Sequence, residues 1–442
     1  MSLCCALVVI EALARRSWDG FLAGTWHGLP GYDFYSIPSS FKNLVSGEGI
    51  FKHKMTVNYQ GSNFAYHPLV AILLGAPLSL LQPSTAIWVY ISVSTTLLTI
   101  GARRILSAAR GLIGPLELPP ILICTLPVYL CLWNGQIHIL TVLSFAWVLS
   151  ELYTATETEY PPSLGLFLAG LLTCLFSKPL ILLAVPGLLL VPKFRKPLLV
   201  SALIYCAVSV AFLFIPALNP DHHFFEGQLM DGIKLQPSLH GWDSPDFPGI
   251  ADNWLHWYRI FYFLFRDTTG LGIQLPEFMS LPVFVADILH TTQYYTQFLV
   301  LPILVGIVGS FALSLQHQRK TLGKDFPMLL VWLGLFSFFL SYPIVWEYHY
   351  ATLQVLTPFV LISLRSPSQR LIPRWALVVI LLAQLSLFLP TPYRWLSSNG
   401  PPERTLIRAF RVVPVLVSYC LVFIFLCRDL LRAKRNHLAK PQ

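Results

Sequence analysis

Charged residues are scarce in this chain. Asp, Glu, Lys and Arg make up 12% of its 442 residues, and hydrophobic residues make up 55%. Soluble domains carry roughly 25% charged residues, so this composition does not fit a water-soluble globular fold. The mean hydropathy is +0.63, and apolar blocks recur along the whole length with short basic or Pro/Gly-rich breaks between them. The sequence therefore predicts a single membrane domain over residues 1–442.

Other features are also missing. The eight cysteines all lie inside apolar stretches, so no disulfide framework is indicated. The segment 1–14 lacks a basic n-region and contains Glu11, which argues against a cleavable signal peptide. This segment is short for a span, so either the true start lies upstream or the helix ends in the headgroup region. We find no internal repeat, low-complexity tract or nucleotide-binding signature.

Basic residues beside the apolar blocks set the predicted topology, and they explain the net charge of +9 without nucleic-acid binding. The span 85–102 ends at Arg103 and Arg104, which the positive-inside rule places in the cytoplasm. Further spans are predicted at 118–133, 137–152, 198–216, 327–342 and 351–364, with two inside 164–191, one before His317 and two before the tail. The expected fold is an all-α polytopic bundle of about 12 transmembrane helices with both termini in the cytoplasm.

Two stretches allow more than one assignment. The stretch 164–191 is either one long kinked helix or two short helices that meet at Ser177-Lys178-Pro179. Two helices are favoured because they keep the basic residues at 193–196 inside. The loop 390–411 falls outside, and either a mis-assigned span or a loop that binds phosphate or anionic lipid would explain its arginines, which are Arg394, Arg404, Arg408 and Arg411.

The long loops fall on the predicted extracytoplasmic face. The first, 15–84, contains a predicted surface helix at 37–45 and an apolar run at 67–81. That run has only about 15 residues, too few to span, so it is read as an interfacial or re-entrant helix. A second long loop covers 217–296, and a basic cytoplasmic tail covers 428–442.

Polar groups that could support chemistry also gather on this face. Asp33 follows Gly31 in the first outer loop and is flanked by aromatic residues. It is either a solvated loop aspartate or a general base that takes a proton from a hydroxyl at the membrane surface. Asn134 and Gln136 sit in a tight turn between two apolar helices, where their amides either satisfy the turn or hydrogen-bond sugar hydroxyls. Lys178 is either a snorkelling lysine or a partner for a lipid phosphate.

The segment 346–350 gives the strongest signal from the residues alone. It places Trp346, Glu347 and His349 in an otherwise apolar region, where ionisable groups are costly. An aromatic belt at the membrane surface is the simpler explanation. The functional one is that His349 donates to a phosphate oxygen while Glu347 orients a sugar or the histidine.

No metal or cofactor is expected. The long loop contains carboxylates and imidazoles that superficially resemble metal ligands, but their spacing matches no metal motif: Asp221, His222, His223, Asp243, Asp246, Asp252 and His256.

With these residues identified, the chain resembles glycosyltransferase family 87, the polyprenyl-phosphate-mannose-dependent mannosyltransferases of the GT-C superfamily. The likeness covers roughly residues 33–363 and rests on the order and spacing of Asp33-Phe34-Tyr35, Tyr66-His67-Pro68, Asn134-Gly135-Gln136, Ser177-Lys178-Pro179 and the segment 343–350. There are two departures. The family often shows Tyr-Pro-Pro where this chain has His67 in the middle position, and an acidic residue followed by His-His where it has Glu347-Tyr348-His349.

The resemblance implies a GT-C-type hexosyltransferase of the cell (inner) membrane, with its site on the extracytoplasmic side. It would move a sugar, expected to be mannose, from a polyprenyl-phosphate donor to a glycolipid or glycan acceptor with inversion. Asp33 would be the catalytic base. The donor phosphate and sugar would be bound by Lys178, His349, Glu347, Asn134, Gln136, Tyr66, His67 and Trp346.

Two other functions remain open. A secondary transporter or lipid flippase would also be an apolar helical bundle, but it should show repeats and broken helices with polar groups near the bilayer midplane. Here the polar groups fall near one surface, beside long loops. A non-catalytic scaffold for envelope assembly is the third possibility, which only loss of activity on point mutation can exclude.

Overall fold

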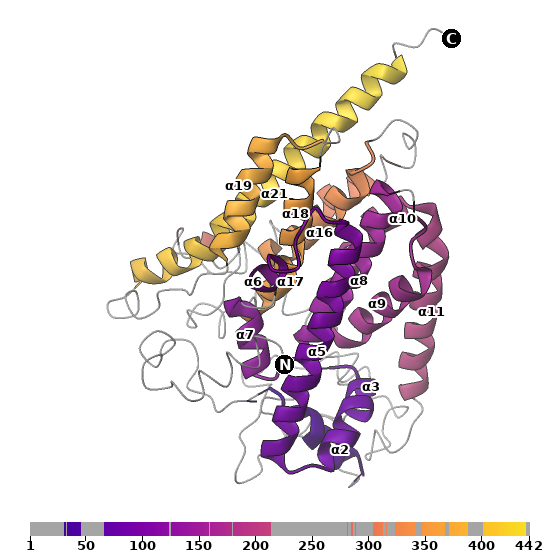
Figure 1. Cartoon of the computed structure of the whole chain (residues 1–442), viewed down its shortest axis with the longest axis vertical. Coiled ribbons are helices and arrows are strands. Elements are labelled where there is room, and N and C mark those ends of the chain that lie inside the picture. The colour runs from indigo at the N-terminus through magenta and orange to yellow at the C-terminus, as the bar shows by residue number, and fades with distance from the viewer. Residues whose placement is uncertain are drawn as a thin grey trace, which may run out of the picture.

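The computed structural model describes residues 31, 33–45, 66–122, 125–158, 160–178, 180–213, 281, 284–285, 288, 304–312, 315, 323–341, 347–366, 371–387 and 401–438. Within these residues the only regular elements are helices, which pack into one elongated bundle (Figure 1). The predicted all-α class is confirmed for this part of the chain.

Four described helices are long and apolar enough to cross a membrane. They are α5 (Pro83–Ala109), α8 (His138–Glu157), α11 (Pro192–Leu213) and the 408–435 part of α21 (Pro401–Leu438). Five shorter apolar segments accompany them, at 68–79, 164–177, 326–340, 351–365 and 374–386. The chain is therefore a helical membrane protein in character, while the number of about 12 spans stays a prediction.

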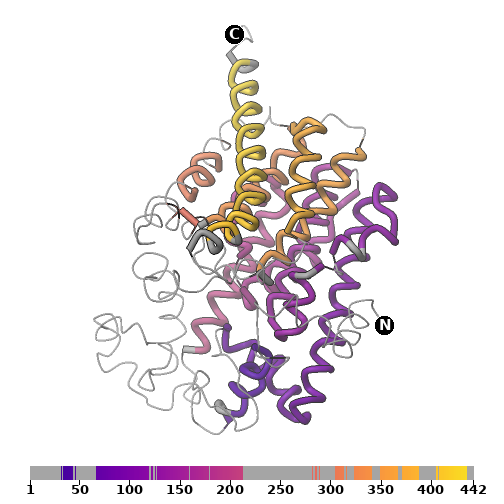
Figure 2. Tube along the Cα trace, turned by 90° about the vertical axis from the view of Figure 1, so that its left-hand side faces the viewer, coloured from indigo at the N-terminus to yellow at the C-terminus, as the bar shows by residue number. Residues whose placement is uncertain are grey.

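The two ends of the bundle are distinct. Helix α2 (Ser36–Val45) and the short helix α3 (Pro68–Val70) lie at the lower end in Figure 1, and the last turns of α21 project from the upper end. Figure 2 shows the same order after a quarter turn. Helix α5 connects the ends, since Tyr90 contacts the segment around Gln136 and Arg104 lies about 21 Å further along the helix axis. We call these the Asp33 end and the Arg104 end.

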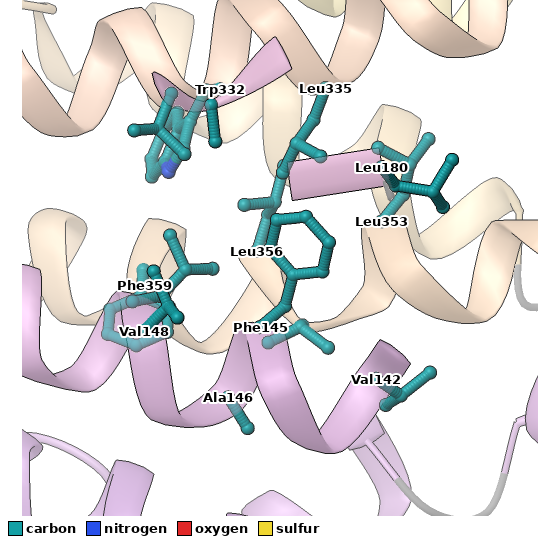
Figure 3. Close-up of a cluster of buried hydrophobic side chains, with 14 of the residues drawn as sticks. Val142, Phe145, Ala146, Val148, Leu180, Trp332, Leu335, Leu353, Leu356 and Phe359 are labelled. Carbon is teal, nitrogen blue, oxygen red and sulfur yellow. The ribbon is translucent and has the colours of Figure 1, made fainter. Parts of the chain in front are cut away.

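Helix α8 and the broken helices beside it form the core. Phe145 and Val148 of α8 face Trp332 of α16 (Phe326–Ser341) and Phe359 of α18 (Leu356–Arg365), as Figure 3 shows. All four side chains are at most 1% exposed. Lipid tails are as apolar as these side chains, so close packing rather than exclusion of water holds such helices together. Gly334 shows how close that packing is, because a Cβ there would overlap the carbonyl of Leu183.

The predicted break in 164–191 is present at Lys178, while two separate membrane spans in this stretch stay a prediction. Helix α9 (Leu164–Ser177) ends beside Lys178, and a 3-10 turn η2 (Leu180–Leu183) and the short helix α10 (Val185–Leu189) follow. Lys178 has extended backbone angles and closes α9 through its N–H, which donates to the carbonyl of Cys174 at 2.9 Å. Lys178 is therefore the last residue before the helix break rather than part of a continuous helix, and its side chain contacts His349 at the Asp33 end.

The first loop contains the two predicted short helical segments. Residues 68–79 form α3, a π-turn η1 (Ala71–Gly75) and α4 (Ala76–Ser79), which is too short to span a membrane. Helix α2 packs on η1, and Ile37 is fully buried there. A Cβ on Gly75 would lie 2.6 Å from the Ile37 carbonyl oxygen, so glycine permits this contact. The helix predicted at 37–45 is therefore docked against the short helical segment 68–79.

One predicted span is divided where the sequence analysis treated it as continuous. The span 118–133 contains α6 (Leu118–Leu122) and α7 (Leu126–Trp133), with Pro127 near the start of α7. The span 351–364 holds α17 (Ala351–Gln354) and α18, and Val355 between them keeps helical backbone angles. Hydropathy measures only how apolar a segment is, whereas proline interrupts the backbone hydrogen bonds of a helix, so the α6–α7 division was not visible in hydropathy.

The expectation of a loop at 390–411 is wrong for residues 401–411, which belong to α21. Arg408 and Arg411 are fully buried. The Arg411 guanidinium donates to the carbonyls of Leu387 at 2.9 Å and Ser386 at 3.5 Å, at the end of α19 (Arg374–Ser386). A cation at a helix C-terminus donates hydrogen bonds to the last carbonyls and interacts favourably with the helix dipole. Arg411 therefore stabilises the end of α19, a role that the positive-inside rule does not predict.

Candidate functional site

Four breaks in helical structure meet at the Asp33 end. They are the turn before α2, the junction of α7 with α8, the junction of α9 with η2, and the 3-10 turn η5 (Glu347–Tyr350). Contacts join α7 to η5 and α7 to α8. Helix breaks expose backbone groups and project polar side chains, so this is where an apolar bundle can assemble a polar site.

The α7–α8 junction is a helix cap of defined geometry. Gly135 has a φ of +64°, and its N–H donates to the carbonyl of Leu132 at 3.2 Å. The N–H of Gln136 donates to the carbonyl of Cys131 at 2.8 Å. These two bonds are the Schellman pattern, which requires a left-handed residue that glycine supplies. The predicted tight turn is therefore confirmed, and its geometry fixes the directions of Asn134 and Gln136.

Backbone hydrogen bonds dock the Asp33 turn onto this cap. The N–H of Gly31 donates to the carbonyl of Trp133 at 2.8 Å, and the N–H of Asp33 donates to the carbonyl of Asn134 at 3.0 Å. A Cβ on Gly135 would overlap the side chain of Phe34, which is fully buried. Two segments about 100 residues apart are thus held in register by main-chain contacts, independently of their polar side chains.

The side chains of Asp33, Gln136 and Tyr66 form one hydrogen-bonded chain. The Gln136 amide N–H donates to Asp33 Oδ2, and the Tyr66 hydroxyl donates to Gln136 Oε1 at 3.2 Å. Tyr90 of α5 donates to the Gln136 carbonyl at 2.9 Å. Asp33, Gln136 and Tyr66 are all buried, with 9%, 2% and 6% exposure. Gln136 therefore contacts the proposed base directly, which the sequence analysis did not foresee.

Lys178 and His349 form the second part of the cluster. Lys178 Nζ lies 3.0 Å from His349 Nε2. An ammonium group can only donate, so a protonated Lys178 requires that Nε2 accepts and that the neutral imidazole holds its proton on Nδ1. In this arrangement Lys178, and not His349 Nε2, presents N–H groups to an anion. Lys178 is partly buried, and its charge interacts attractively with the Asp33 carboxylate.

The structure thus brings Asp33 into contact with Gln136 and Lys178 into contact with His349, while the single cavity expected for all of them stays a prediction. Asn134 lies at the same junction, and it is 3% exposed. Within the described part of the chain its Nδ2 has no hydrogen-bond partner. A buried amide donor without a partner is costly, and a bound ligand with an acceptor oxygen would relieve that cost.

His67 lies in a different setting from Tyr66 beside it. Its Nδ1 accepts from the N–H of Leu69 at 3.2 Å, so its other nitrogen carries the proton and donates to Ser209 Oγ at 3.1 Å. Ser209 belongs to α11, and the His67 ring also packs edge-on against Phe176 and Phe212. Both ring nitrogens are thus used to cap α3 and to join it to α11. This geometry supports a structural role better than the expected contact with the donor.

Some candidates fall outside what the structure describes. Trp346 and the carboxylate and imidazole residues between 221 and 256 lie outside the described residues, and of Glu347 only the backbone, in η5, is described. Among the described residues, no group of three or more His, Cys, Asp or Glu side chains is arranged to hold a metal ion.

A cavity in the structure lies elsewhere, at the Arg104 end. Side chains of α8, α16, α18 and α19 line it, including Tyr153, Asp325 and Trp332. The expected cavity that joins Asp33 and His349 and opens to the outer leaflet stays a prediction.

Sequence analysis missed several residues that support the cluster. His138, the first residue of α8, is fully buried, and its Nε2 lies 3.1 Å from the His349 carbonyl oxygen and 2.6 Å from Thr352 Oγ1. Ser177 Oγ, next to Lys178, lies 3.1 Å from Thr141 Oγ1 of α8. The signal for His138 was present, since it is an ionisable residue two positions after Gln136 at the start of an apolar helix.

With this geometry in hand, the chain was compared with known proteins. No protein-family model matches it, and no curated protein or solved structure is significantly similar to it.

Proposed function

We propose that this chain is an integral membrane hexosyltransferase. It would move a hexose, with mannose as the expected sugar, from a polyprenyl-phosphate donor to a hydroxyl of a glycolipid or glycan acceptor. The reaction would occur at the extracytoplasmic face of the cell membrane, within a bundle of about 12 spans. The resemblance to glycosyltransferase family 87 suggests this reaction, and the arrangement at the Asp33 end supports it.

The proposal rests on one observation: the buried carboxylate of Asp33 and two basic side chains, Lys178 and His349, lie at the same end of an apolar bundle. Lys178 and His349 are separated by 171 positions along the chain, yet they are in hydrogen-bond contact. A protonated Lys178 beside a neutral His349 places a positive charge in a poorly solvated position, where a bound anion would be favoured. Helix α8 begins beside them, so the positive end of its dipole also favours an anion. A lipid phosphate has the required charge and reaches this level of the membrane.

In this proposal Asp33 acts as the base of a single displacement. Its carboxylate would accept the proton of the acceptor hydroxyl as the acceptor oxygen attacks the anomeric carbon of the sugar. The bond from that carbon to the phosphate oxygen breaks on the opposite side, and the lipid phosphate leaves with the electron pair. The anomeric centre is therefore inverted.

Lys178 would stabilise the charge that accumulates on the leaving phosphate. Its N–H groups are held by the α9–η2 break and by His349 before the substrate arrives, so little reorganisation is needed during the reaction. Asn134 would add a neutral donor to the donor sugar or its phosphate. No nucleotide or metal is required by this scheme, because the energy of the activated sugar resides in the lipid-phosphate bond.

The test compares Asp33→Asn with His349→Ala in proteoliposomes supplied with polyprenyl-phosphate mannose. Asp33→Asn keeps the shape of the side chain but cannot accept the proton, so transfer should fall roughly 100-fold to 10,000-fold while donor binding persists. His349→Ala should weaken donor binding as well as turnover, because Lys178 loses its support in the ground state too.

Asp325→Asn is the matched control. Asp325 accepts from the N–H of Leu371 at the Arg104 end, so this change should leave transfer unaltered. Transfer at the wild-type rate by Asp33→Asn would remove the base assignment. Wild-type protein that moves intact lipid across the bilayer without transferring sugar would favour the flippase.

A further inference from the structure

We propose that Gln136 is a positioning residue that keeps Asp33 ionised and oriented, and that Tyr66 fixes the direction of the Gln136 amide. This inference rests on the proposed role of Asp33 as the base. It assigns Gln136 a contact with the protein in place of the expected contact with a sugar hydroxyl.

The main chain leaves Gln136 little freedom. Its N–H donates to the carbonyl of Cys131 at 2.8 Å, and its own carbonyl accepts from the Tyr90 hydroxyl at 2.9 Å. The residue is 2% exposed, so its side chain cannot turn to solvent. Both ends of the side-chain amide are used inside the protein, because Nε2 faces Asp33 and Oε1 faces Tyr66.

Chemistry selects the direction of the amide. An ionised carboxylate only accepts hydrogen bonds, so it requires the NH2 group of Gln136 and would repel its carbonyl oxygen. The Tyr66 hydroxyl can donate to the Oε1 that is then turned toward it. Rotating the amide by half a turn would break both contacts, so Tyr66 stabilises the orientation in which Asp33 is an acceptor.

This arrangement should influence the protonation of Asp33. Hydrogen bonds to the charged form of a carboxyl group favour that form. The titratable groups that face Asp33 from the surrounding elements are Tyr66, Tyr90, Cys131 and Lys178. Tyrosine and cysteine side chains are ordinarily neutral at pH 7, so Lys178 is the charged neighbour in this group. Lys178 also contacts His349 and attracts the carboxylate through its charge, whereas Gln136 donates to the carboxylate directly.

The experiment replaces Gln136 by leucine, which has a similar volume but cannot donate, and measures kcat/KM for sugar transfer against pH. The acid limb of the profile should move to higher pH by about one unit. Part of the lost rate should return at high pH, where Asp33 is ionised without help. Tyr66→Phe, which removes a single oxygen atom, should give a smaller shift in the same direction and guards against misfolding of the first variant.

A second readout does not depend on sugar transfer. Dicyclohexylcarbodiimide reacts with protonated carboxyl groups in apolar surroundings, and mass spectrometry can follow its attachment to Asp33 at each pH. Labelling of Asp33 should extend to higher pH in Gln136→Leu than in the wild type. The matched control is Gln384→Leu, because Gln384 of α19 is also fully buried but lies outside the cluster. Its profile should coincide with that of the wild type.

The outcomes separate the two hypotheses. A labelling profile that is shifted in Gln136→Leu, together with a wild-type protein that transfers no sugar, would support the positioning role and overturn the proposed function. A rate that falls equally at every pH, with Asp33 labelling unchanged, would overturn the positioning role and leave the function standing.

Discussion

The two ends of the bundle use charged side chains in opposite ways. At the Arg104 end, the guanidinium of Arg104 contacts Glu151 at 2.5 Å, and the other Glu151 oxygen accepts from the N–H of Ser163 at 2.6 Å. At the Asp33 end, Lys178 contacts a histidine, and the carboxylate of Asp33 is held by a neutral amide. Arg104 and Glu151 pair opposite charges in direct contact, whereas at the Asp33 end the ionisable groups contact neutral partners, an arrangement that is more typical of functional sites.

The arrangement at the Arg104 end is explained by structure alone. Glu151 is fully buried, and its two oxygens join α5, α8 and the first residue before α9. Arg365 forms a bidentate ion pair with Glu117 and also donates to the carbonyl of Leu112 at 2.9 Å. These charged side chains thus form hydrogen bonds or ion pairs with residues in loops or at helix ends. Mutations at the Arg104 end should therefore change stability, whereas mutations at the Asp33 end should change activity.

Among the variants that compare the two ends, the largest effect is expected for Lys178→Met, which keeps the length of the side chain but removes its charge. Losing a preorganised donor at a developing anion typically costs roughly 100-fold to 1,000-fold in kcat. Sugar transfer and donor binding would be measured together in proteoliposomes. Lys196→Met, an exposed lysine of α11, is the control that should retain full activity. Equal activity in both variants would remove the distinction between the two ends.

Most residues of the cluster at the Asp33 end were predicted as candidates from the sequence, but the contacts between them were not. The positive-inside rule placed Asp33, Gln136, Lys178 and His349 at one predicted membrane level, and in the structure Asp33 contacts Gln136 and Lys178 contacts His349. A membrane level gives depth but not direction around the helix axis. For this reason sequence analysis could not show that Gln136 faces Asp33 or that His67 faces α11.

Chain breaks limited the prediction of the fold. Short apolar segments such as α6, α7 and α10 are as apolar as a membrane span but are too short to cross a bilayer. A hydropathy pattern therefore either merges two of them into one predicted span or counts one of them as a full span. The burial of Arg411 depends on where α19 ends, which is a tertiary contact between distant segments. The break at Lys178 could be predicted because a proline and a charge coincide there in an apolar stretch.

A smaller effect, on stability alone, is expected for Arg104→Met. It leaves the fully buried Glu151 without its cation, and the cost should be about 2–3 kcal/mol because Arg104 itself is partly exposed. Unfolding of the detergent-solubilised protein, followed by circular dichroism, would measure it. Adding Glu151→Gln should recover most of the loss, since an amide oxygen can still accept from Ser163. Sugar transfer by the folded fraction should be unchanged, and a double variant as unstable as Arg104→Met would contradict the pairing.

The smallest effect is expected for Glu117→Gln, which tests the Arg104 end at its exposed edge. The Arg365 guanidinium and the N–H of Gly114 hold the pKa of Glu117 at about 2, below its ordinary 4.5. A lowered carboxyl pKa stabilises the fold fully above pH 4.5, and this contribution is lost as the pH falls toward 2. Both side chains are more than 40% exposed, so water and salt screen the pair and the difference in Tm should be small.

Thermal unfolding at several pH values should show a difference in Tm between wild type and Glu117→Gln that is constant near neutrality and shrinks on acidification. A difference that grows as the pH falls would mean that the charge of Glu117 destabilises this end, contrary to the closed ion pairs proposed for it.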